Sequence, residues 1–330
     1  MADNISEGKR RVVVLGTGGT IAGRAATAAD NVGYIAGQVG VTELLEGVAA
    51  PTGIALQAEQ VAQVDSKDMS FAIWRRLAER CAHWLAHADV AGLVVTHGTD
   101  TLEETAFFLQ SVLAPVKPIV LTSAMRPATA LTPDGPQNVR DALAVASSPH
   151  AQGVVVVCAG AVHSAFDVQK VHTYRLDAFD SGDAGPVAYV EEGALRELRR
   201  WPVSPPEPAR LCFELMRHAV QWPRVEILMS HAEARGSIID ALMAQQAGTA
   251  EPVQGLVLAA TGNGTLHEAL EAAALRAQAA GIAVLRATRC VQGRILPTPS
   301  AALRDAGALT PVKARIALML ELMSIQAGGA

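Results

Sequence analysis

The chain has 330 residues, half of them apolar, and a formal net charge of −5. This length allows one large or two medium domains, and the mild acidity without a basic stripe argues against nucleic acid as a partner. No apolar run reaches membrane-spanning length, and the polar residues 1–11 contain no apolar signal-peptide core. We therefore expect a cytoplasmic protein that does not bind membranes.

Cysteine and histidine spacing does not indicate a metal site. The cysteines are widely separated, with no C-x-x-C pair, and are predicted to be buried thiols: Cys81, Cys158, Cys212 and Cys290. His83 and His87 have i, i+4 spacing but lack the glutamate of an H-E-x-x-H motif. We expect neither a metal nor another cofactor.

Short β-branched runs alternate with longer helical patterns in the first part of the chain. The predicted strands are 12–14, 93–96, 118–122 and 154–157, and the predicted helices are 71–88, 101–113 and 138–146. This alternation indicates an α/β fold with a mostly parallel sheet flanked by helices. We assign it to a larger N-terminal catalytic domain, residues 1–198.

A second, smaller α/β domain is predicted for residues 222–330. The intervening segment 199–221 contains the proline-dense stretch 201–208, which favours an extended interdomain linker. Beyond it the predicted strands are 225–229, 255–259 and 282–285, and the predicted helices are 236–246, 266–280 and 311–325.

Two threonines follow apolar runs in unusual glycine-containing segments: Thr20 within 16–23 and Thr99 within 96–101. In open α/β sheets ligands bind beyond the carboxyl ends of strands. A hydroxyl there, beside small residues and backbone N–H groups, has the setting of a nucleophile next to an oxyanion site. Backbone N–H groups near Gly19 or Thr99 are the candidates for stabilising that oxyanion.

Each segment also has a plainer interpretation. The glycine-rich stretch could be a tight turn, and Thr99 or Thr101 could cap a helix whose first turn holds Glu103 and Glu104. The stretch does not fit a nucleotide-binding dehydrogenase, because Ile21 occupies the third glycine position of G-x-G-x-x-G. It also lacks the lysine of a phosphate loop.

The two segments, Thr17-Gly18-Gly19-Thr20-Ile21 and Thr96-His97-Gly98-Thr99-Asp100-Thr101, resemble the signature segments of bacterial-type L-asparaginases. Further segments extend the resemblance from about Val12 to Leu322. Tyr34–Gly40 resembles the family's mobile lid, and Asp65–Met69 its substrate-carboxylate loop. Other matching segments are 124–127, 134–138, 167–170 and 262–264.

This resemblance implies hydrolysis of L-asparagine to L-aspartate and ammonia. Thr20 would attack the side-chain amide carbon and form an acyl-enzyme, with Tyr34 on the lid close to its hydroxyl. Thr99 and Lys170 would form a second hydroxyl–amine pair. Asp100 follows Thr99 directly, so Lys170 would have both a carboxylate and a hydroxyl in reach.

The resemblance also implies a set of substrate-binding residues and a homo-oligomer. Asp100 would bind the α-ammonium group and Ser66 the α-carboxylate, with Lys67 beside them. The family forms tetramers, as dimers of dimers with shared active sites, and Asn263 matches a contact made across subunits.

The sequence departs from the family pattern at two places that bear on activity. Lys67 stands where many secreted members have glutamine, and we hypothesise that it weakens substrate affinity or narrows specificity. The segment 289–297 lacks the acidic residue that reaches a neighbouring subunit's site, and no equivalent precedes Asp305. Tyr34 would then lack its usual partner. The lid region also holds a one-residue insertion within 24–33.

Three alternative functions stay open. The first is a glutaminase-asparaginase of mixed specificity. The second is an asparaginase-like subunit of a tRNA-dependent amidotransferase, which would carry an extra amino-terminal domain. The third is a non-catalytic protein that uses Asp100 and Ser66 to bind an amino acid.

Overall fold

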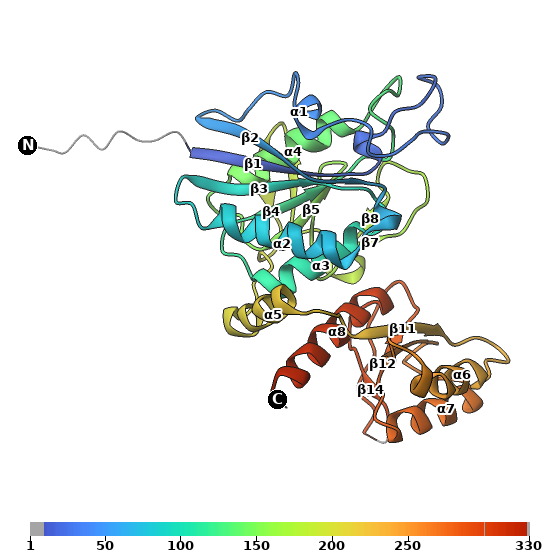
Figure 1. The fold of residues 1–330 in the computed structure, drawn as a ribbon. Helices are drawn as coiled ribbons and strands as arrows, with labels where there is room; N and C mark the ends of the chain where they lie inside the picture. The colour runs from blue at the N-terminus through green and yellow to red at the C-terminus, as the bar shows by residue number, and fades with distance from the viewer. Residues whose placement is uncertain (1–9, 300, 329–330) are drawn as a thin grey trace, which may run out of the picture. The chain divides into compact units, whose positions relative to one another are not determined.

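A computed structural model describes residues 10–299 and 301–328. The chain forms two compact units, the first ending at Ala209 and the second beginning at Arg210 (Figure 1). Residues 1–9 of the polar segment 1–11, in which we expected no signal-peptide core, lie outside the described residues.

The first unit is built on an eight-stranded sheet with the order β10-β9-β6-β5-β4-β3-β1-β2. In chain order these strands are β1 (Arg10–Gly18), β2 (Ile54–Val64), β3 (Val90–Thr96), β4 (Ile119–Thr122), β5 (Val154–Cys158), β6 (Ala161–Ser164), β9 (Ala188–Glu191) and β10 (Ala194–Glu197). The strands from β2 to β5 pair in parallel, and β6, β9 and β10 extend the sheet with antiparallel pairs. The predicted mixed α/β fold is confirmed.

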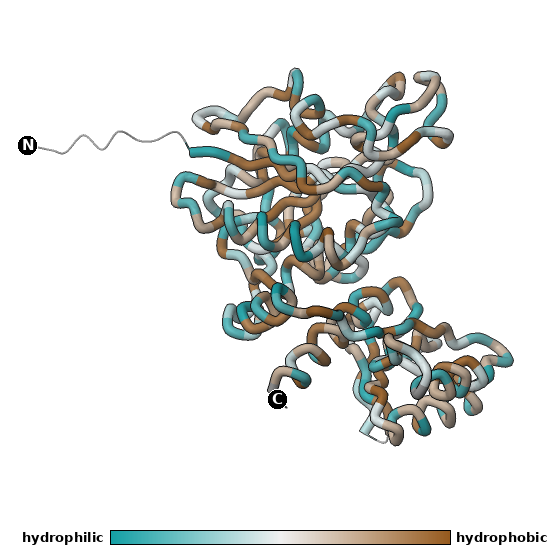
Figure 2. Tube along the Cα trace, in the orientation of Figure 1, coloured by the Kyte–Doolittle hydropathy of each residue, from teal (hydrophilic) through white to brown (hydrophobic). Residues whose placement is uncertain are grey.

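The central strands form the core because both faces of the sheet are covered. Every residue of β3 is buried, and Val12 to Leu15 of β1 are fully buried. Such strands appear in a sequence as continuous apolar runs. Figure 2 shows the same feature as hydrophobic segments along the middle of the first unit.

The flanking helices of the first unit are α1 (Val41–Leu44), α2 (Phe71–Leu85), α3 (Leu102–Leu113) and α4 (Gly135–Ser147). In Figure 1, α2 and α3 lie on one face of the sheet and α4 on the other. Ser70 caps α2, since its hydroxyl accepts a hydrogen bond from the N–H of Ile73. A separate two-stranded ribbon consists of β7 (Gln169–Lys170) and β8 (Phe179–Asp180).

Strand β2 and helix α5 (Pro206–His218) are the two longest of the observed elements that the predicted set did not include. Strand β2 forms one edge of the sheet and is mostly half-buried. Because an edge strand tolerates polar side chains, its glutamines and Glu59 interrupt the apolar run by which the buried strands were predicted. Helix α5 lies within the predicted linker. Proline is tolerated in a first helical turn, where the N–H groups have no intrahelical acceptor, so Pro206 and Pro208 do not prevent this helix.

The second unit contains a four-stranded parallel sheet with the order β11-β12-β13-β14. Its elements are β11 (Arg224–Met229), α6 (Ser237–Ala244), β12 (Val253–Ala260), α7 (Glu268–Ala279), β13 (Ala283–Thr288), β14 (Arg304–Asp305) and α8 (Pro311–Gly328). None of the described helices combines the length and hydropathy that crossing a membrane requires.

We predict that Gly92→Ala destabilises the first unit by about 1–3 kcal/mol, the usual cost of overpacking a core. A Cβ at Gly92 in β3 would lie 2.3 Å from the carbonyl oxygen of Ala146 in α4, and backbone cannot easily yield. The measurement is urea unfolding followed by circular dichroism. Gly40→Ala is the matched control, because a Cβ there meets nothing within 4 Å. Equal unfolding free energies for the two variants would contradict the prediction.

Candidate active site

The candidate site lies where two neighbouring parallel strands end. Strands β1 and β3 pair directly, with Gly16 opposite Thr96. Thr20 and Thr99 follow their carboxyl ends, and each is only 6% exposed. The fold therefore brings together two hydroxyls that are far apart in the sequence.

Glycine is required at the point where the two segments meet. Gly19 has a φ of +83°, and a Cβ there would lie 2.3 Å from the Cα of Gly98. A Cβ at Gly98 would in turn lie 2.5 Å from the Oγ of Ser66. A side chain at Gly19 would push the Thr20 and Thr99 segments apart, and one at Gly98 would displace Ser66.

Thr20 begins a single 3-10 turn, Thr20–Ala22, and its hydroxyl pairs with Tyr34. The Thr20 Oγ1 and Tyr34 Oη atoms are 2.6 Å apart. Tyr34 lies in a hairpin closed by backbone hydrogen bonds between Arg24 and Ile35, at 3.0 and 2.9 Å. The Tyr34 ring also packs against Gly23.

Thr99 belongs to a second set with Lys170 and Asp100. The Nζ of Lys170 donates to Thr99 Oγ1 at 2.7 Å and to Asp100 Oδ1 at 2.6 Å. Lys170 is held on β7, because its backbone N–H donates to Glu103 Oε2 in the first turn of α3 at 2.8 Å. The Lys170 side chain is 21% exposed and that of Asp100 52%, so Asp100 can reach a ligand from solvent.

Ser66 lies next to this second set and is 2% exposed. Its Oγ accepts the backbone N–H of Asp100 at 3.1 Å, and its carbonyl oxygen accepts the Thr101 hydroxyl at 2.7 Å. Because Ser66 Oγ acts as an acceptor, its own proton is available to an anion.

Lys67 turns toward neighbouring carboxylates. Its Nζ lies 2.6 Å from Asp65 Oδ2 and 3.5 Å from Asp68 Oδ2. The hydrogen bond with Asp65 raises the pKa of Lys67, which is exposed. This charge is therefore compensated locally.

Asn263 belongs to the second unit, in the loop after β12. Its Nδ2 donates to Leu296 O at 3.2 Å, and its Oδ1 accepts the Leu296 N–H at 2.7 Å.

The first unit brings together most of the predicted site residues, with Lys67 at their edge: Thr20, Tyr34, Ser66, Thr99, Asp100 and Lys170. The N–H of Gly19, a predicted oxyanion donor, is occupied by Val64 O at 2.8 Å, which leaves the N–H groups of Thr20 and Thr99 as candidates.

Sequence reasoning missed a buried polar chain behind Gly98. His97 is fully buried, with Nδ1 2.7 Å from Gly98 O and Nε2 2.9 Å from the Thr105 hydroxyl, which also accepts Trp74 Nε1–H at 2.9 Å. A carbonyl can only accept, so Nδ1 carries the proton. Burial lowers the pKa of His97 to about 4, which keeps it neutral. A histidine inside the Thr99 signature segment was the available signal.

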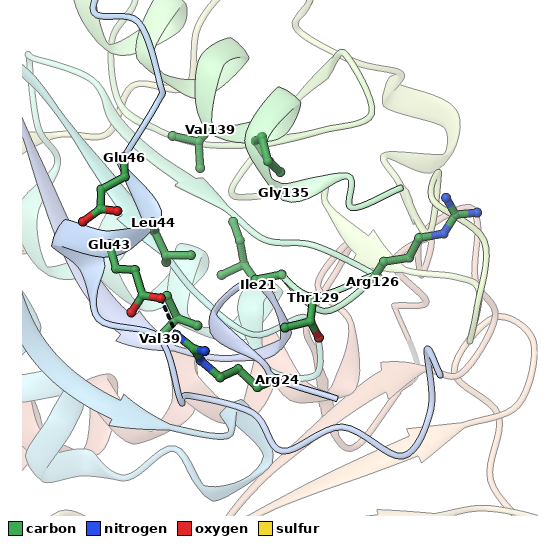
Figure 3. Close-up of a pocket in the computed structure, with 12 residues that line it drawn as sticks. Ile21, Arg24, Val39, Glu43, Leu44, Glu46, Arg126, Thr129, Gly135 and Val139 are labelled. Atoms are coloured by element: carbon green, nitrogen blue, oxygen red, sulfur yellow. Dashed lines mark hydrogen bonds and ion pairs between the residues drawn. The ribbon is translucent and has the colours of Figure 1, made fainter. Parts of the chain in front are cut away.

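A cavity of about 230 Å³ lies behind the Thr20 turn (Figure 3). Ile21, Val39, Leu44 and Val139 contribute apolar walls, and the Arg24–Glu43 ion pair borders it. None of the predicted site residues lines it. In residues 10–299 and 301–328, no three His, Cys, Asp or Glu side chains are grouped to hold a metal ion.

Comparison with known proteins identifies the family. Residues 11–202 match the family described as Asparaginase, N-terminal, and residues 224–326 match the Glutaminase/Asparaginase C-terminal domain. The chain belongs to the bacterial-type L-asparaginase family. It is an amidohydrolase, as the resemblance implied.

Similar members of the asparaginase family cover nearly the whole chain. L-asparaginase 2 of Bacillus subtilis is 37% identical over 317 residues, which are 94% of this chain and 81% of that protein. Glutaminase-asparaginase of Pseudomonas fluorescens is 34% identical over 325 residues, 96% and 87% of the two chains. The crystal structure of a probable cytoplasmic L-asparaginase from Campylobacter jejuni has a TM-score of 0.85 at 34% identity and covers 95% of each chain.

The buried histidines predict a loss of stability in mild acid. Burial lowers the pKa of both His97 and His163 to about 4, whereas in an unfolded chain it is about 6.5. Protons then bind the unfolded chain preferentially, so stability is complete above pH 6.5 and is lost as the pH falls toward 4. Each histidine should lower the free energy of unfolding by about 2 kcal/mol between pH 7 and pH 5.

The free energy of unfolding should be lower at pH 5 than at pH 7, and we expect His97→Gln to reduce this difference by about 2 kcal/mol. The measurement is urea unfolding at pH 7 and at pH 5. His218→Gln is the control, because the His218 side chain is 76% exposed. An unchanged pH dependence in His97→Gln would show that His97 is not held neutral by the fold.

Proposed function

We propose that this asparaginase-family protein hydrolyses L-asparagine to L-aspartate and ammonia through a covalent intermediate on Thr20. The observation that carries the proposal is the pairing of each buried threonine with its own hydrogen-bonding partner at adjacent strand ends. Thr20 has Tyr34 at 2.6 Å, and Thr99 has Lys170 at 2.7 Å.

In the first step, Thr20 Oγ1 attacks the side-chain amide carbon of the substrate. Its proton passes to the Tyr34 oxygen while Tyr34 gives its own proton to the leaving nitrogen, so the products are a threonyl ester and ammonia. The 2.6 Å contact allows this transfer without rearrangement of either side chain. Water then adds to the ester carbon, which releases L-aspartate and restores the Thr20 hydroxyl.

The second set supplies positioning and charge. Because Lys170 donates to Thr99, the Thr99 proton is free to bond a water molecule or a carbonyl oxygen. The N–H groups of Thr20 and Thr99 are the remaining oxyanion donors, an interaction that contributes several kcal/mol in a dry site. This supports a role for Thr99 and Lys170 in turnover rather than in binding alone.

Asp100 and Ser66 provide complementary groups for an α-amino acid. The half-exposed Asp100 carboxylate suits the α-ammonium group, and the free proton of Ser66 suits the α-carboxylate. L-glutamine is a second candidate substrate, since one similar relative is named glutaminase-asparaginase. A binding protein without catalysis is the alternative, and ammonia release in the assay below would exclude it.

Shared active sites and cellular location are also proposals. We infer a dimer of dimers in which Asn263 acts across subunits, as the resemblance to the family implies; within its own chain the Asn263 side chain bonds the backbone of Leu296. Sedimentation showing only monomer in active samples would contradict this. The similarity to a probable cytoplasmic L-asparaginase supports a cytoplasmic location.

We predict that purified protein releases ammonia from L-asparagine and that Thr20→Ala and Thr99→Ala each lower kcat by about 10²–10⁴-fold. Each variant removes a hydroxyl from a separate hydrogen-bonded pair. Thr52→Ala is the control, because Thr52 is exposed in a surface turn. Absence of ammonia with the unmodified protein would reject the enzymatic proposal, and full activity of Thr99→Ala would reject the role of the second set.

The position of Lys67 changes our expectation for substrate affinity. Asp65 and Asp68 compensate its charge, so Lys67→Gln should change the KM for L-asparagine by less than about threefold, as for a screened surface charge. Asp100→Asn, measured in parallel, should raise KM by about tenfold or more, because it removes the proposed ammonium-binding charge. A tenfold fall in KM for Lys67→Gln would instead show that Lys67 repels the substrate.

A further inference from the structure

Thr101 occupies the N-cap position of α3 but does not cap it. Threonine at this position normally accepts a hydrogen bond from a backbone N–H of the first helical turn, which stabilises the helix. The Thr101 side chain makes no such bond. Its hydroxyl instead donates to the carbonyl oxygen of Ser66 at 2.7 Å, across 35 positions of sequence.

Two consecutive residues therefore hold Ser66 at two points. The N–H of Asp100 binds the side-chain oxygen of Ser66 at 3.1 Å, and the hydroxyl of Thr101 binds its carbonyl oxygen at 2.7 Å. The Ser66 carbonyl oxygen also accepts the N–H of Met69 at 3.2 Å within its own turn, so the bonds from Asp100 and Thr101 tie this turn to the Asp100 segment. Two bonds at different atoms fix both the position and the orientation of Ser66 relative to the Asp100 segment.

This arrangement constrains the groups that recognise an α-amino acid. In the proposed function, Ser66 binds the α-carboxylate and Asp100 the α-ammonium group, which are joined through one carbon atom in the substrate. A binding site for them requires a matching, fixed separation between Ser66 and Asp100. Ser66 belongs to the short 3-10 turn Ser66–Asp68 and Asp100 to the loop before α3, so the separation depends on contacts between these segments.

We propose that Thr101 is a positioning residue for recognition of the α-carboxylate, acting through Ser66 and without touching the substrate. This inference rests on the proposed function, because it assigns Ser66 and Asp100 their binding roles. It predicts a defect in affinity rather than in chemistry, since neither Thr20 nor Lys170 depends on the Thr101 hydroxyl.

The test compares Thr101→Val, which keeps the shape but removes the hydroxyl, with Thr101→Ser, which keeps the hydroxyl. For Thr101→Val we expect the KM for L-asparagine to rise by about fivefold to tenfold, the usual effect of losing one hydrogen bond, with kcat within about twofold. Thr101→Ser should restore KM. A fall in kcat without a change in KM, or equal KM values for the two variants, would overturn the proposal.

A second measurement distinguishes positioning from general support of the fold. In a Ser66→Ala background, Thr101→Val should add little to the loss of affinity, because Thr101 acts through Ser66. Independent losses that multiply in the double variant would contradict the proposal. Should Thr101→Val not fold, Thr101→Ala takes its place in the same cycle.

Ligand binding by calorimetry separates this inference from the proposed function. L-aspartate carries the α-carboxylate, and β-alanine is the same molecule without it. Thr101→Val should weaken L-aspartate by about fivefold to tenfold and leave β-alanine unchanged. If the unmodified protein releases no ammonia from L-asparagine, the proposed hydrolysis fails, yet this comparison still tests Thr101. Equal weakening of both ligands would overturn the positioning role.

Discussion

The close approach of the backbones at Gly19 and Gly98 is the constraint on which the site depends. The Gly19 φ of +83° and the 2.3 Å from a hypothetical Cβ to Gly98 leave no room for a side chain. This contact joins the end of β1 to the end of β3, and it sets Thr20 beside the segment that carries Thr99. The buried His97 chain supports the same contact from behind, because its Nδ1–H bonds the Gly98 carbonyl oxygen.

The two threonines are held by different kinds of contact. Thr99 lies in a fixed set, in which Lys170 is tied to both Thr99 and Asp100, and α3 holds the Lys170 backbone through Glu103. Thr20 depends on Tyr34, which is carried by a hairpin closed by two backbone hydrogen bonds. The Thr99 set and the hairpin that carries Tyr34 are consistent with a reaction that needs both a fixed framework and an opening through which the substrate enters.

Charge in the region is mostly compensated by short-range pairs. Lys67 is paired with Asp65, Arg24 with Glu43, and Lys170 with Asp100. In the proposed function, the half-exposed Asp100 carboxylate meets the α-ammonium group of the substrate. We therefore expect the departure at Lys67 to have a smaller electrostatic effect on substrate binding than its position in the sequence indicates, since its charge is balanced within its own loop.

The sequence by itself determined the α/β class, the family and the residue types at the site, because buried parallel strands and signature segments are local patterns. It did not reveal β2, whose polar residues belong to a sheet edge, or α5, whose prolines lie in a first turn. It also offered capping of a helix as a plainer interpretation of Thr99 or Thr101. Only the tertiary structure decided that Thr101 binds Ser66 and that Gly19 touches Gly98. These are contacts between segments distant in the chain, and local propensity carries no information about which partner a hydroxyl or an ammonium group will meet.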